Sequence, residues 1–457
     1  MYTSVLKYVL FILFISLSCS FYVISYFEIF PVSVYGFLIA LYFVCQIIFA
    51  LRNRYLMNKL PLSEKSVTLL IVGYREDLDY WKNCINSVLK QDYSNISKIV
   101  ISIDGNEEDD MYMYNTAKEI LDADLNLPYE KYIILLNPHG GKREAICHGL
   151  TYIKKNMPDV SYTLFIDSDT VLTPSATKHL VNCIDGNEKN GCATGSLLVF
   201  DNHLLGKIVN ARYAYAFNVE RAAMSCLGVM NCCSGPLSIY KNEVITEEFI
   251  NEFLTQTFMS VKCGPGDDRH LTNMFLIRGW KSKQTHLSIG YTEAPKTFIR
   301  FIKQQTRWMR SFFREQYWQM RAIPKQSVFL AIITQYEILY PLFVFVWLIR
   351  LTYHKTPEQL IKITISTIGI IVLRTFILLC IMKDCSYIYN LFYLPMFMFI
   401  LLPVKIYSLC TMKEMNWITS TGIQIINKCD IELFLIFSLI ILWNCSIVYS
   451  ISTLFLK

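Results

Sequence analysis

Two adjacent carboxylates lie in the stretch CGPGDDRHLTN, residues 263–273. Asp267 and Asp268 follow a turn that contains two glycines, and Arg269 comes next. Because neighbouring side chains leave an extended chain on opposite sides, we expect the two acids to have different roles. One could take a proton from an attacking hydroxyl group as a general base, while the other holds the loop.

A second acidic pair lies in DSDT, where Asp167 and Asp169 follow the apolar run YTLFI. Residues i and i+2 of an extended chain project to the same side. Two hard oxygen ligands on one side suit Mg²⁺ or Mn²⁺, which usually also binds water and substrate phosphates. This pattern alone is more often a surface turn, but its place at the end of a predicted strand favours a metal site.

Two further motifs carry groups that suit a nucleotide. Asp104 ends the apolar run KIVISID, although an Asp-Gly pair also favours a plain turn. HGGKRE places Gly140, Gly141 and Lys142 at a predicted helix start, where backbone N–H groups and a cation favour phosphate. A helix start without a ligand is the simpler interpretation of that motif taken alone.

The stretch QQTRW puts three useful side chains on one face of a predicted helix. Gln304, Arg307 and Trp308 are spaced i, i+3 and i+4. A guanidinium group can bind a diphosphate, and an indole ring offers a stacking plane. The alternative is a helix in the membrane interface that is anchored by its tryptophan.

The elements that would position these groups alternate between strands and helices. The segments 66–72, 98–106 and 162–170 are predicted strands, and 78–91 and 142–155 are helix-like. Such alternation predicts an α/β fold with a mostly parallel sheet. Ligands of open parallel sheets bind beyond the carboxyl ends of the strands, which is where the acidic motifs stand.

Composition indicates a globular domain between membrane segments. Of the 457 residues, 53% are hydrophobic and 18% are charged, whereas soluble domains carry about 25% charged residues. We expect an N-terminal membrane region at 1–54 with two spans, a globular domain at 55–295, an amphipathic interfacial segment at 296–324 and membrane helices at 325–457. The basic stretch RNRYLMNK after the second apolar run places the globular domain in the cytosol.

Charge and cysteine content indicate which kinds of ligand the chain is expected to bind. The net charge of +6 includes no basic run of the kind that binds nucleic acid, so no nucleic-acid partner is expected. Basic residues near the membrane ends, including those of 296–325, suit a face that lies against anionic lipid. The 15 cysteines show no paired CxxC motifs, which favours buried reduced thiols over a zinc site.

Taken in order, the motifs resemble the hyaluronan synthases of the single-domain eukaryotic and viral type. The resemblance covers residues 66–425 and rests on GYRED, IDGNEEDDMYM, HGGKREA, DSDT, AFNVERA, CCSGPLSIY, GDDRHLTN, QQTRWMRSFFRE and LLPVK. It implies a membrane-embedded, processive, inverting family 2 glycosyltransferase with a GT-A type domain and a mixed, mostly parallel sheet. The implied substrates are UDP-N-acetylglucosamine and UDP-glucuronate, and the implied location is the plasma membrane, in which the enzyme spans several times.

The resemblance also implies a role for each matching residue. Asp268 is the implied catalytic base, and Asp169 is the implied ligand of the metal. The residues implied to hold the uridine are Tyr74, Glu76 and Asp104. Those implied to contact the nucleotide sugar are Lys142 and Asp167. Those implied to border the acceptor or the diphosphate are Ser234, Gly235, Pro236, Arg269, Gln304, Arg307 and Trp308, with Cys232 and Cys233 as packing beside them.

The polar loop near 413–430 resembles the loop that closes over UDP in this family, which implies that Trp417 and Thr419 bind substrate. The loop reads WITSTG, so the glycine that follows the tryptophan in the family is absent. Because this loop must reach the cytosol, we expect the apolar segment 395–409 to lie in the interface or to re-enter the membrane on one side, rather than to cross it. Arg374 is expected to line the polymer channel or to pair within the helix bundle.

Three alternatives remain open from the sequence. A chitin-type synthase would use UDP-N-acetylglucosamine alone. A non-catalytic membrane scaffold or transporter is supported only by the altered loop and by Ser196. A carrier-lipid glycosyltransferase does not need the QxxRW pattern. The sequence predicts no oligomeric state.

Overall fold

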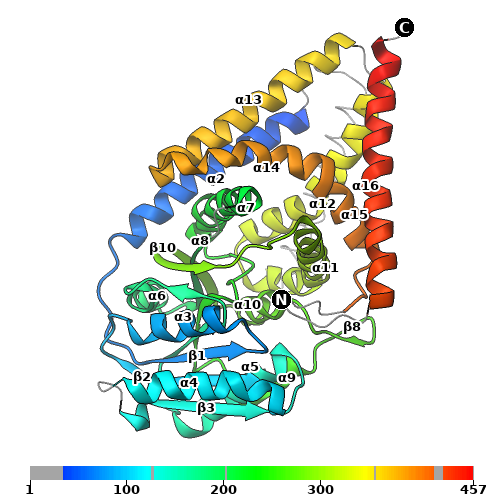
Figure 1. Ribbon diagram of the computed structural model, residues 1–457. Helices are drawn as coiled ribbons and strands as arrows, with labels where there is room; N and C mark the ends of the chain where they lie inside the picture. Colours follow the sequence, from blue (N-terminus) through cyan, green and yellow to red (C-terminus); the bar gives the residue numbers. More distant parts are fainter. Residues whose placement is uncertain (1–33, 125–127, 201–202, 355–356, 416–425, 456–457) are drawn as a thin grey trace.

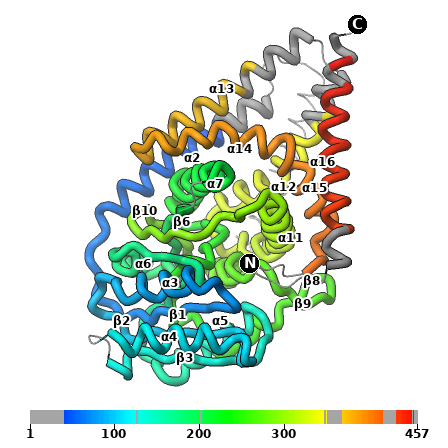
Figure 2. The backbone as a smooth tube through the Cα atoms, viewed as in Figure 1, coloured from blue at the N-terminus to red at the C-terminus, as the bar shows by residue number. Residues whose placement is uncertain are grey.

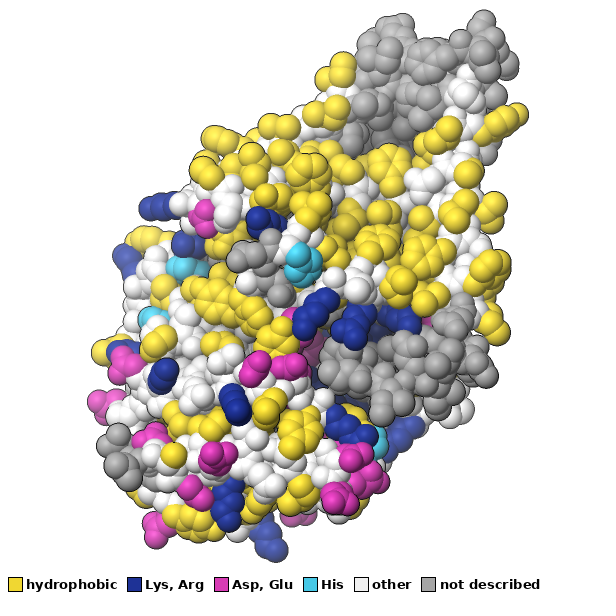
Figure 3. All heavy atoms as spheres, viewed as in Figure 1, with side chains coloured by type: hydrophobic (Ala, Val, Ile, Leu, Met, Phe, Trp, Pro, Cys, Tyr) yellow, Lys and Arg dark blue, Asp and Glu magenta, His cyan; other side chains and the backbone are white. Residues whose placement is uncertain are grey.

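The computed structural model describes residues 34–124, 128–200, 203–354, 357–415 and 426–455. An α/β body lies at one end of the molecule, and long helices extend from it at the other (Figure 1). The tube view shows that the chain runs from helix α2 (Val34–Met57) into the body and then returns to the helical end (Figure 2). Hydrophobic side chains cover the helical end, while charged side chains are scattered over the body (Figure 3).

An eight-stranded sheet forms the centre of the body, in the order β3-β2-β1-β4-β7-β6-β10-β5. Neighbours are parallel except that β7 is antiparallel to β4 and β6, and β5 is antiparallel to β10. The expected mixed, mostly parallel sheet is thereby confirmed. Its strands are β1 (Val67–Gly73), β2 (Ile96–Asp104), β3 (Tyr132–Asn137), β4 (Tyr162–Asp167), β5 (Val171–Leu172), β6 (Asn190–Val199), β7 (Leu237–Lys241) and β10 (Lys281–Thr292). A separate hairpin consists of β8 (Thr257–Phe258) and β9 (Val261–Lys262).

Helices cover both faces of the sheet. Alternate residues of β1 point to opposite sides, so Leu70 and Val72 enter one core and Leu69 and Ile71 enter the other. The helices of the body are α3 (Leu78–Leu89), α4 (Met111–Ala123), α5 (Lys142–Asn156), α6 (Ala176–Asp185), α7 (Leu204–Tyr215), α8 (Ala222–Leu227), α9 (Glu247–Leu254) and α10 (Asp267–Ile277). A π-helical turn, Ala216–Arg221, joins α7 to α8.

Six further helices lie outside the body and follow one another along the chain. They are α11 (Phe298–Ala322), α12 (Val328–His354), α13 (Pro357–Met382), α14 (Asn390–Met396), α15 (Leu402–Cys410) and α16 (Ile426–Phe455). Among the described residues, the segments long and apolar enough to cross a membrane are Val328–Val346, Cys385–Cys410 and Ile431–Tyr449. The second predicted N-terminal span forms α2, while the first lies outside the described residues.

The segment that we expected to lie in the interface, 395–409, belongs to one of these candidate spans by length and composition. It is not a single straight helix, because a π-helical turn, Phe397–Leu401, separates α14 from α15 and the chain bends there (Figure 1). The interfacial placement therefore stays a prediction. Arg374 of α13 has an ion-pair partner, but this partner lies in the body and not in the helix bundle. Its Nη2 lies 3.5 Å from Oε1 of Glu220 in the π-helical turn Ala216–Arg221.

Helix α11 departs from the expectation of an arginine-rich face against lipid. Arg310 and Arg314 are buried in protein, with 6% and 1% of their surface exposed. Arg310 pairs with Glu432 of α16 at 2.6 Å, and Arg314 donates to the Pro265 carbonyl at 2.5 Å. These two cations therefore hold α11 to its protein neighbours, and the helical spacing alone could not distinguish carboxylates and carbonyls from lipid headgroups.

Candidate active site

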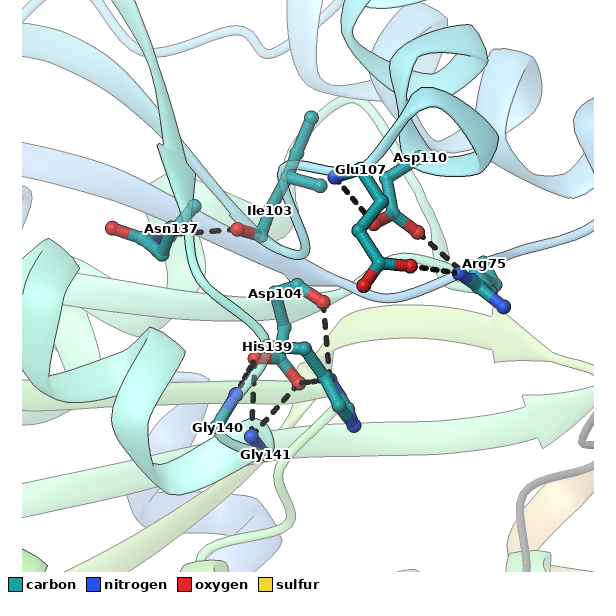
Figure 4. A network of polar contacts seen from close by, with 10 residues as sticks. Arg75, Ile103, Asp104, Glu107, Asp110, Asn137, His139, Gly140 and Gly141 are labelled. Atoms are coloured by element: carbon teal, nitrogen blue, oxygen red, sulfur yellow. Dashed lines mark hydrogen bonds and ion pairs between the residues drawn. The ribbon is translucent and has the colours of Figure 1, made fainter.

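The acids predicted at strand ends do meet at the carboxyl edge of the sheet. Asp104 ends β2, and its buried carboxylate accepts from the loop that precedes α5 (Figure 4). Oδ1 accepts from the backbone N–H groups of Gly140 and Gly141 at 2.9 and 3.1 Å. Oδ2 accepts from Gly141 at 3.1 Å, and Nδ1 of His139 also lies 3.1 Å away. Asp104 thus anchors the HGG loop and brings Lys142 to the sheet edge.

Lys142 joins two acids that are far apart in the sequence. Its Nζ lies 2.6 Å from Oδ1 of Asp167 and 3.6 Å from Oδ2 of Asp267. Burial lowers the pKa of Lys142, but the two carboxylates outweigh burial and raise it. Burial raises the pKa of Asp167 to about 6, with Lys142 acting to lower it and Asp169 to raise it. Lys142 is therefore a charged link between the DSDT and GDDR motifs.

Asp267 and Asp268 face different partners, as the sequence predicted. Asp267 is the first residue of α10 and contacts Lys142. Oδ1 of Asp268 accepts from the Arg269 backbone N–H at 2.8 Å, and Oδ2 accepts from the Cys232 thiol at 3.3 Å. Burial, followed by the Asp268 charge, raises the pKa of Cys232 to about 12, so this thiol stays protonated and orients the carboxylate. Cys232 therefore does more than the packing that we expected of it, because its thiol also donates to the Asp268 carboxylate.

Asp169 lies beside Glu76 and two threonines. Its Oδ1 accepts from Thr170 at 3.2 Å, and its Oδ2 accepts from Thr292 at 3.0 Å. Ser168 donates to Oε2 of Glu76 at 2.9 Å. Burial, then the Asp169 charge, raises the pKa of Glu76 to about 7, although the Ser168 hydroxyl acts to lower it. Glu76 therefore belongs to the neighbourhood of the DSDT motif.

This neighbourhood fits a divalent cation that is shared with a substrate. Within the described residues, no three His, Cys, Asp or Glu side chains form a ready-made ligand cluster. Asp167 is engaged by Lys142, whereas each oxygen of Asp169 has one hydroxyl partner and a further lone pair. Mg²⁺ and Mn²⁺ sites of nucleotide enzymes commonly combine one or two carboxylates with phosphate and water. Asp169 is the protein ligand that suits this arrangement.

Tyr74 lies at the outer end of β1, where its ring stacks on His139 with centroids 4.3 Å apart. The next residue, Arg75, has a left-handed φ of 43° and ion pairs with Asp110 at 2.8 Å and Glu107 at 3.3 Å (Figure 4). A non-glycine residue in this conformation is uncommon, and here the ion pairs hold it. The sequence had not singled out His139, although it directly precedes the HGGK glycines.

The residues of the QxxRW pattern lie on α11. Burial lowers the pKa of Arg307, and the charges of Asp267, Asp268 and Asp167 act to raise it. Oε1 of Gln304 is buried and has no hydrogen-bond partner among the described residues. A buried acceptor without a donor is costly unless a ligand supplies one. This helix therefore presents a cation and an acceptor to the site.

Among the predicted acceptor-side residues, Gly235 lines the pocket that Lys142, Asp167 and Asp268 also line. Gly235 lies against the ion pair, because a Cβ added there would be 3.4 Å from Nζ of Lys142 and 3.5 Å from Oδ2 of Asp167. Ser234 is buried and donates its backbone N–H to Thr194. The guanidinium of Arg269 lies 5.3 Å from the centre of the Phe312 ring. Trp417 and Thr419 lie outside the described residues.

The loop before Asp267 is held by two buried arginines and shaped by one glycine. Arg143 donates to the Gly264 carbonyl at 2.8 Å, and Arg314 donates to the Pro265 carbonyl at 2.5 Å. Gly266 has a left-handed φ of 91°. A Cβ at this position would lie 2.7 Å from Cβ of Ser311 on α11. Backbone conformation and close packing therefore both require glycine immediately before the two acids.

Replacing Gly266 by alanine is expected to lower stability by about 2–4 kcal/mol, because left-handed strain and overpacking add. Turnover should fall at least tenfold, since Asp268 is displaced. Gly279→Ala is the matched control, because Gly279 has a φ of 89° but no neighbour within 4 Å of an added Cβ. Thermal unfolding and turnover of both purified variants check this. Equal losses in the two variants would show that contact with Ser311 does not hold the loop.

The chain is similar in sequence to known glycosyltransferases. Residues 64–311 match the family model described as "Glycosyltransferase like family 2". The chain is 30% identical over 433 residues to hyaluronan synthase 2 of Homo sapiens, with 86% of this chain and 77% of that protein covered. It is 29% identical over 420 residues to hyaluronan synthase 3 of Xenopus laevis, with 84% and 74% covered. A solved structure of a mannosyltransferase from Pyrobaculum calidifontis, in complex with GDP-Man and Mn²⁺, matches with 12% identity and a TM-score of 0.47, covering 82% of this chain and 98% of that one.

Proposed function

The chain belongs to the hyaluronan synthases of glycosyltransferase family 2, and from this membership we propose how its site makes the polymer. The enzyme is a membrane glycosyltransferase with a GT-A-like domain. We propose that it takes UDP-N-acetylglucosamine and UDP-glucuronate alternately and passes hyaluronan through its own helices. The observation that carries this proposal is the meeting of Lys142, Asp167, Asp267 and Asp268 at the carboxyl edge of the sheet.

The nucleotide would bind across the ends of β1, β2 and β4. Tyr74 offers a ring for the base, and Asp104 offers carboxylate acceptors at the end of β2. Lys142, already charged, would approach the diphosphate sugar, with Asp167 holding the ammonium group in place. Glu76 would complete the uridine side, next to Ser168.

Asp169 would be the residue that holds Mg²⁺ or Mn²⁺ when the nucleotide sugar binds. Such a cation stabilises the negative charge that develops on the departing UDP. Arg307 faces the same region from α11 and would add a second positive charge to it. The Thr292 hydroxyl would fix the orientation of the Asp169 carboxylate from β10.

Asp268 would take the proton of the acceptor hydroxyl as that oxygen attacks the sugar. The Cys232 thiol and the Arg269 backbone N–H hold the carboxylate from two sides. Attack from the side opposite UDP inverts the anomeric carbon, so a single base is sufficient and no covalent sugar intermediate forms. Asp267, held by Lys142, would leave proton transfer to its neighbour.

The acceptor sugar would lie between Ser234, Gly235 and the α11 helix. The unpartnered Oε1 of Gln304 can accept from a sugar hydroxyl, and the Trp308 ring can stack on a sugar face. Arg269 lies over the Phe312 ring of α11. In this arrangement the globular body is cytosolic, the polymer leaves through the helices, and the membrane is the plasma membrane.

The proposed substrates are tested by supplying each labelled nucleotide sugar alone and then both together to purified protein with Mn²⁺. We expect long polymer only from the pair, with the product degraded by hyaluronidase. Polymer from UDP-N-acetylglucosamine alone, degraded by chitinase, would replace this proposal with a chitin-type synthase. No UDP release from any combination would indicate a scaffold or a transporter.

A further inference from the structure

The His139 side chain makes two contacts that an incoming nucleobase would also need. Its ring stacks on Tyr74, with centroids 4.3 Å apart and planes inclined by 16°. Its Nδ1 lies 3.1 Å from Oδ2 of Asp104 (Figure 4). Because an ionised carboxylate only accepts, Nδ1 carries the hydrogen of this bond. His139 thus places a flat ring on the tyrosine and an N–H group on the aspartate.

A uracil ring has the same two features, a flat face and a ring N–H donor. If Tyr74 and Asp104 receive the base, the imidazole and the uracil cannot both hold these contacts. A third ring does not fit within a 4.3 Å stack, since two stacked rings already lie at contact distance. We propose that His139 is an internal occupant of the nucleobase position, which UDP must displace. This inference rests on the proposed role of Tyr74 and Asp104 in holding the uridine.

The surroundings allow His139 to leave without disturbing the loop. Asp104 keeps its bonds from the backbone N–H groups of Gly140 and Gly141, so the HGG turn stays anchored. The His139 side chain is 52% exposed, and its departure uncovers no core. Its movement therefore costs chiefly the two contacts that the base then takes over, together with a longer approach of 3.4 Å between Nδ1 and the Asp104 backbone carbonyl.

Tyr74 has support of its own and would remain in position. Its neighbour Arg75 is tied to Asp110 and Glu107 by ion pairs, and its guanidinium lies 5.4 Å from the centre of the Tyr74 ring. None of these contacts involves His139. The nucleobase can therefore replace the His139 imidazole while Tyr74 stays in place. The affinity for UDP then depends on how strongly His139 holds that position.

Removal of the internal competitor should strengthen nucleotide binding. In His139→Ala we expect the Kd for UDP to fall about two- to tenfold, because the loss of one competing aromatic contact changes a dissociation constant by about that factor. The Kd for inorganic diphosphate, which has no base, should not change. His139→Phe keeps a ring over Tyr74 but loses the bond to Asp104, so its Kd for UDP should lie between those of His139→Ala and the wild type. Calorimetry on the full chain in detergent, with Mn²⁺ present, measures all three.

His148→Ala is the matched control, because this histidine is exposed on α5, and its UDP affinity should equal that of the wild type. Weaker or unchanged UDP binding in His139→Ala would overturn the displacement. An equal gain for UDP and inorganic diphosphate would also overturn it, because the effect would not arise at the base. Tyr74→Ala separates the two proposals: if it leaves UDP affinity unchanged, the proposed uridine contacts fail as well.

Discussion

Replacing Asp268 by asparagine is expected to lower polymer synthesis about 10²–10⁴-fold, which is the usual contribution of a general base. Asparagine has nearly the same shape and can still accept from the Arg269 N–H, but it cannot take a proton from the acceptor. The affinity for UDP should stay within about twofold of the wild type, because Lys142 pairs with Asp167 and Asp267 and not with Asp268.

The variant Asp267→Asn is the comparison for Asp268→Asn. Asp267→Asn removes one of the two carboxylates that hold Lys142, so it should weaken nucleotide-sugar binding and raise KM more than it lowers kcat. Initial rates over a range of both nucleotide sugars, together with UDP calorimetry, distinguish the two variants. If Asp268→Asn keeps more than a tenth of the wild-type turnover, or if both variants lose kcat alike, the assignment of the base to Asp268 is wrong.

Replacing Asp169 by alanine is expected to abolish the gain in UDP affinity that Mn²⁺ provides and to lower turnover about 10²–10³-fold, as loss of an electrostatic stabiliser does. Without metal, the variant and the wild type should bind UDP about equally weakly. The physical reason is that Asp167 cannot take over as ligand while Lys142 holds it at 2.6 Å.

Asp159→Ala is the matched control for this variant, because Asp159 is exposed in the turn before β4, at the opposite end of the strand from the DSDT motif. It should leave both turnover and the response to Mn²⁺ unchanged. UDP calorimetry with Mn²⁺ and with a chelator gives the measurement. A normal response to Mn²⁺ in Asp169→Ala would exclude Asp169 as the ligand.

Both predictions follow from one electrostatic feature of the site. Several acids lie at the sheet edge around one lysine and one arginine. Burial is the largest cause of the raised pKa values of Glu76 and Asp167, and repulsion by the Asp169 carboxylate raises both further. Such a region favours a further cation. A diphosphate alone would meet repulsion there, whereas a diphosphate that carries a divalent cation would not.

Local sequence patterns determined the α/β body of this protein. Apolar runs that end in acids predicted β1, β2 and β4, and Asp104 and Asp167 end two of these strands in the structure. Parallel strands bring their carboxyl ends to one edge, so the strand pattern predicted that Asp104 and Asp167 would lie at the same edge. The motifs also predicted that Asp267 and Asp268 differ, because neighbouring side chains diverge.

Only the tertiary structure decided which groups pair. Lys142 meets Asp267, the Cys232 thiol meets Asp268, and His139 lies on Tyr74. Arg314, in a helix whose pattern indicated a lipid-facing side, instead holds the Pro265 carbonyl beside the active site. Strands and helices arise from the periodicity of neighbouring residues and can be predicted from it. Contacts between side chains distant in the sequence depend on how the sheet, α10 and α11 pack, and no local pattern encodes that packing.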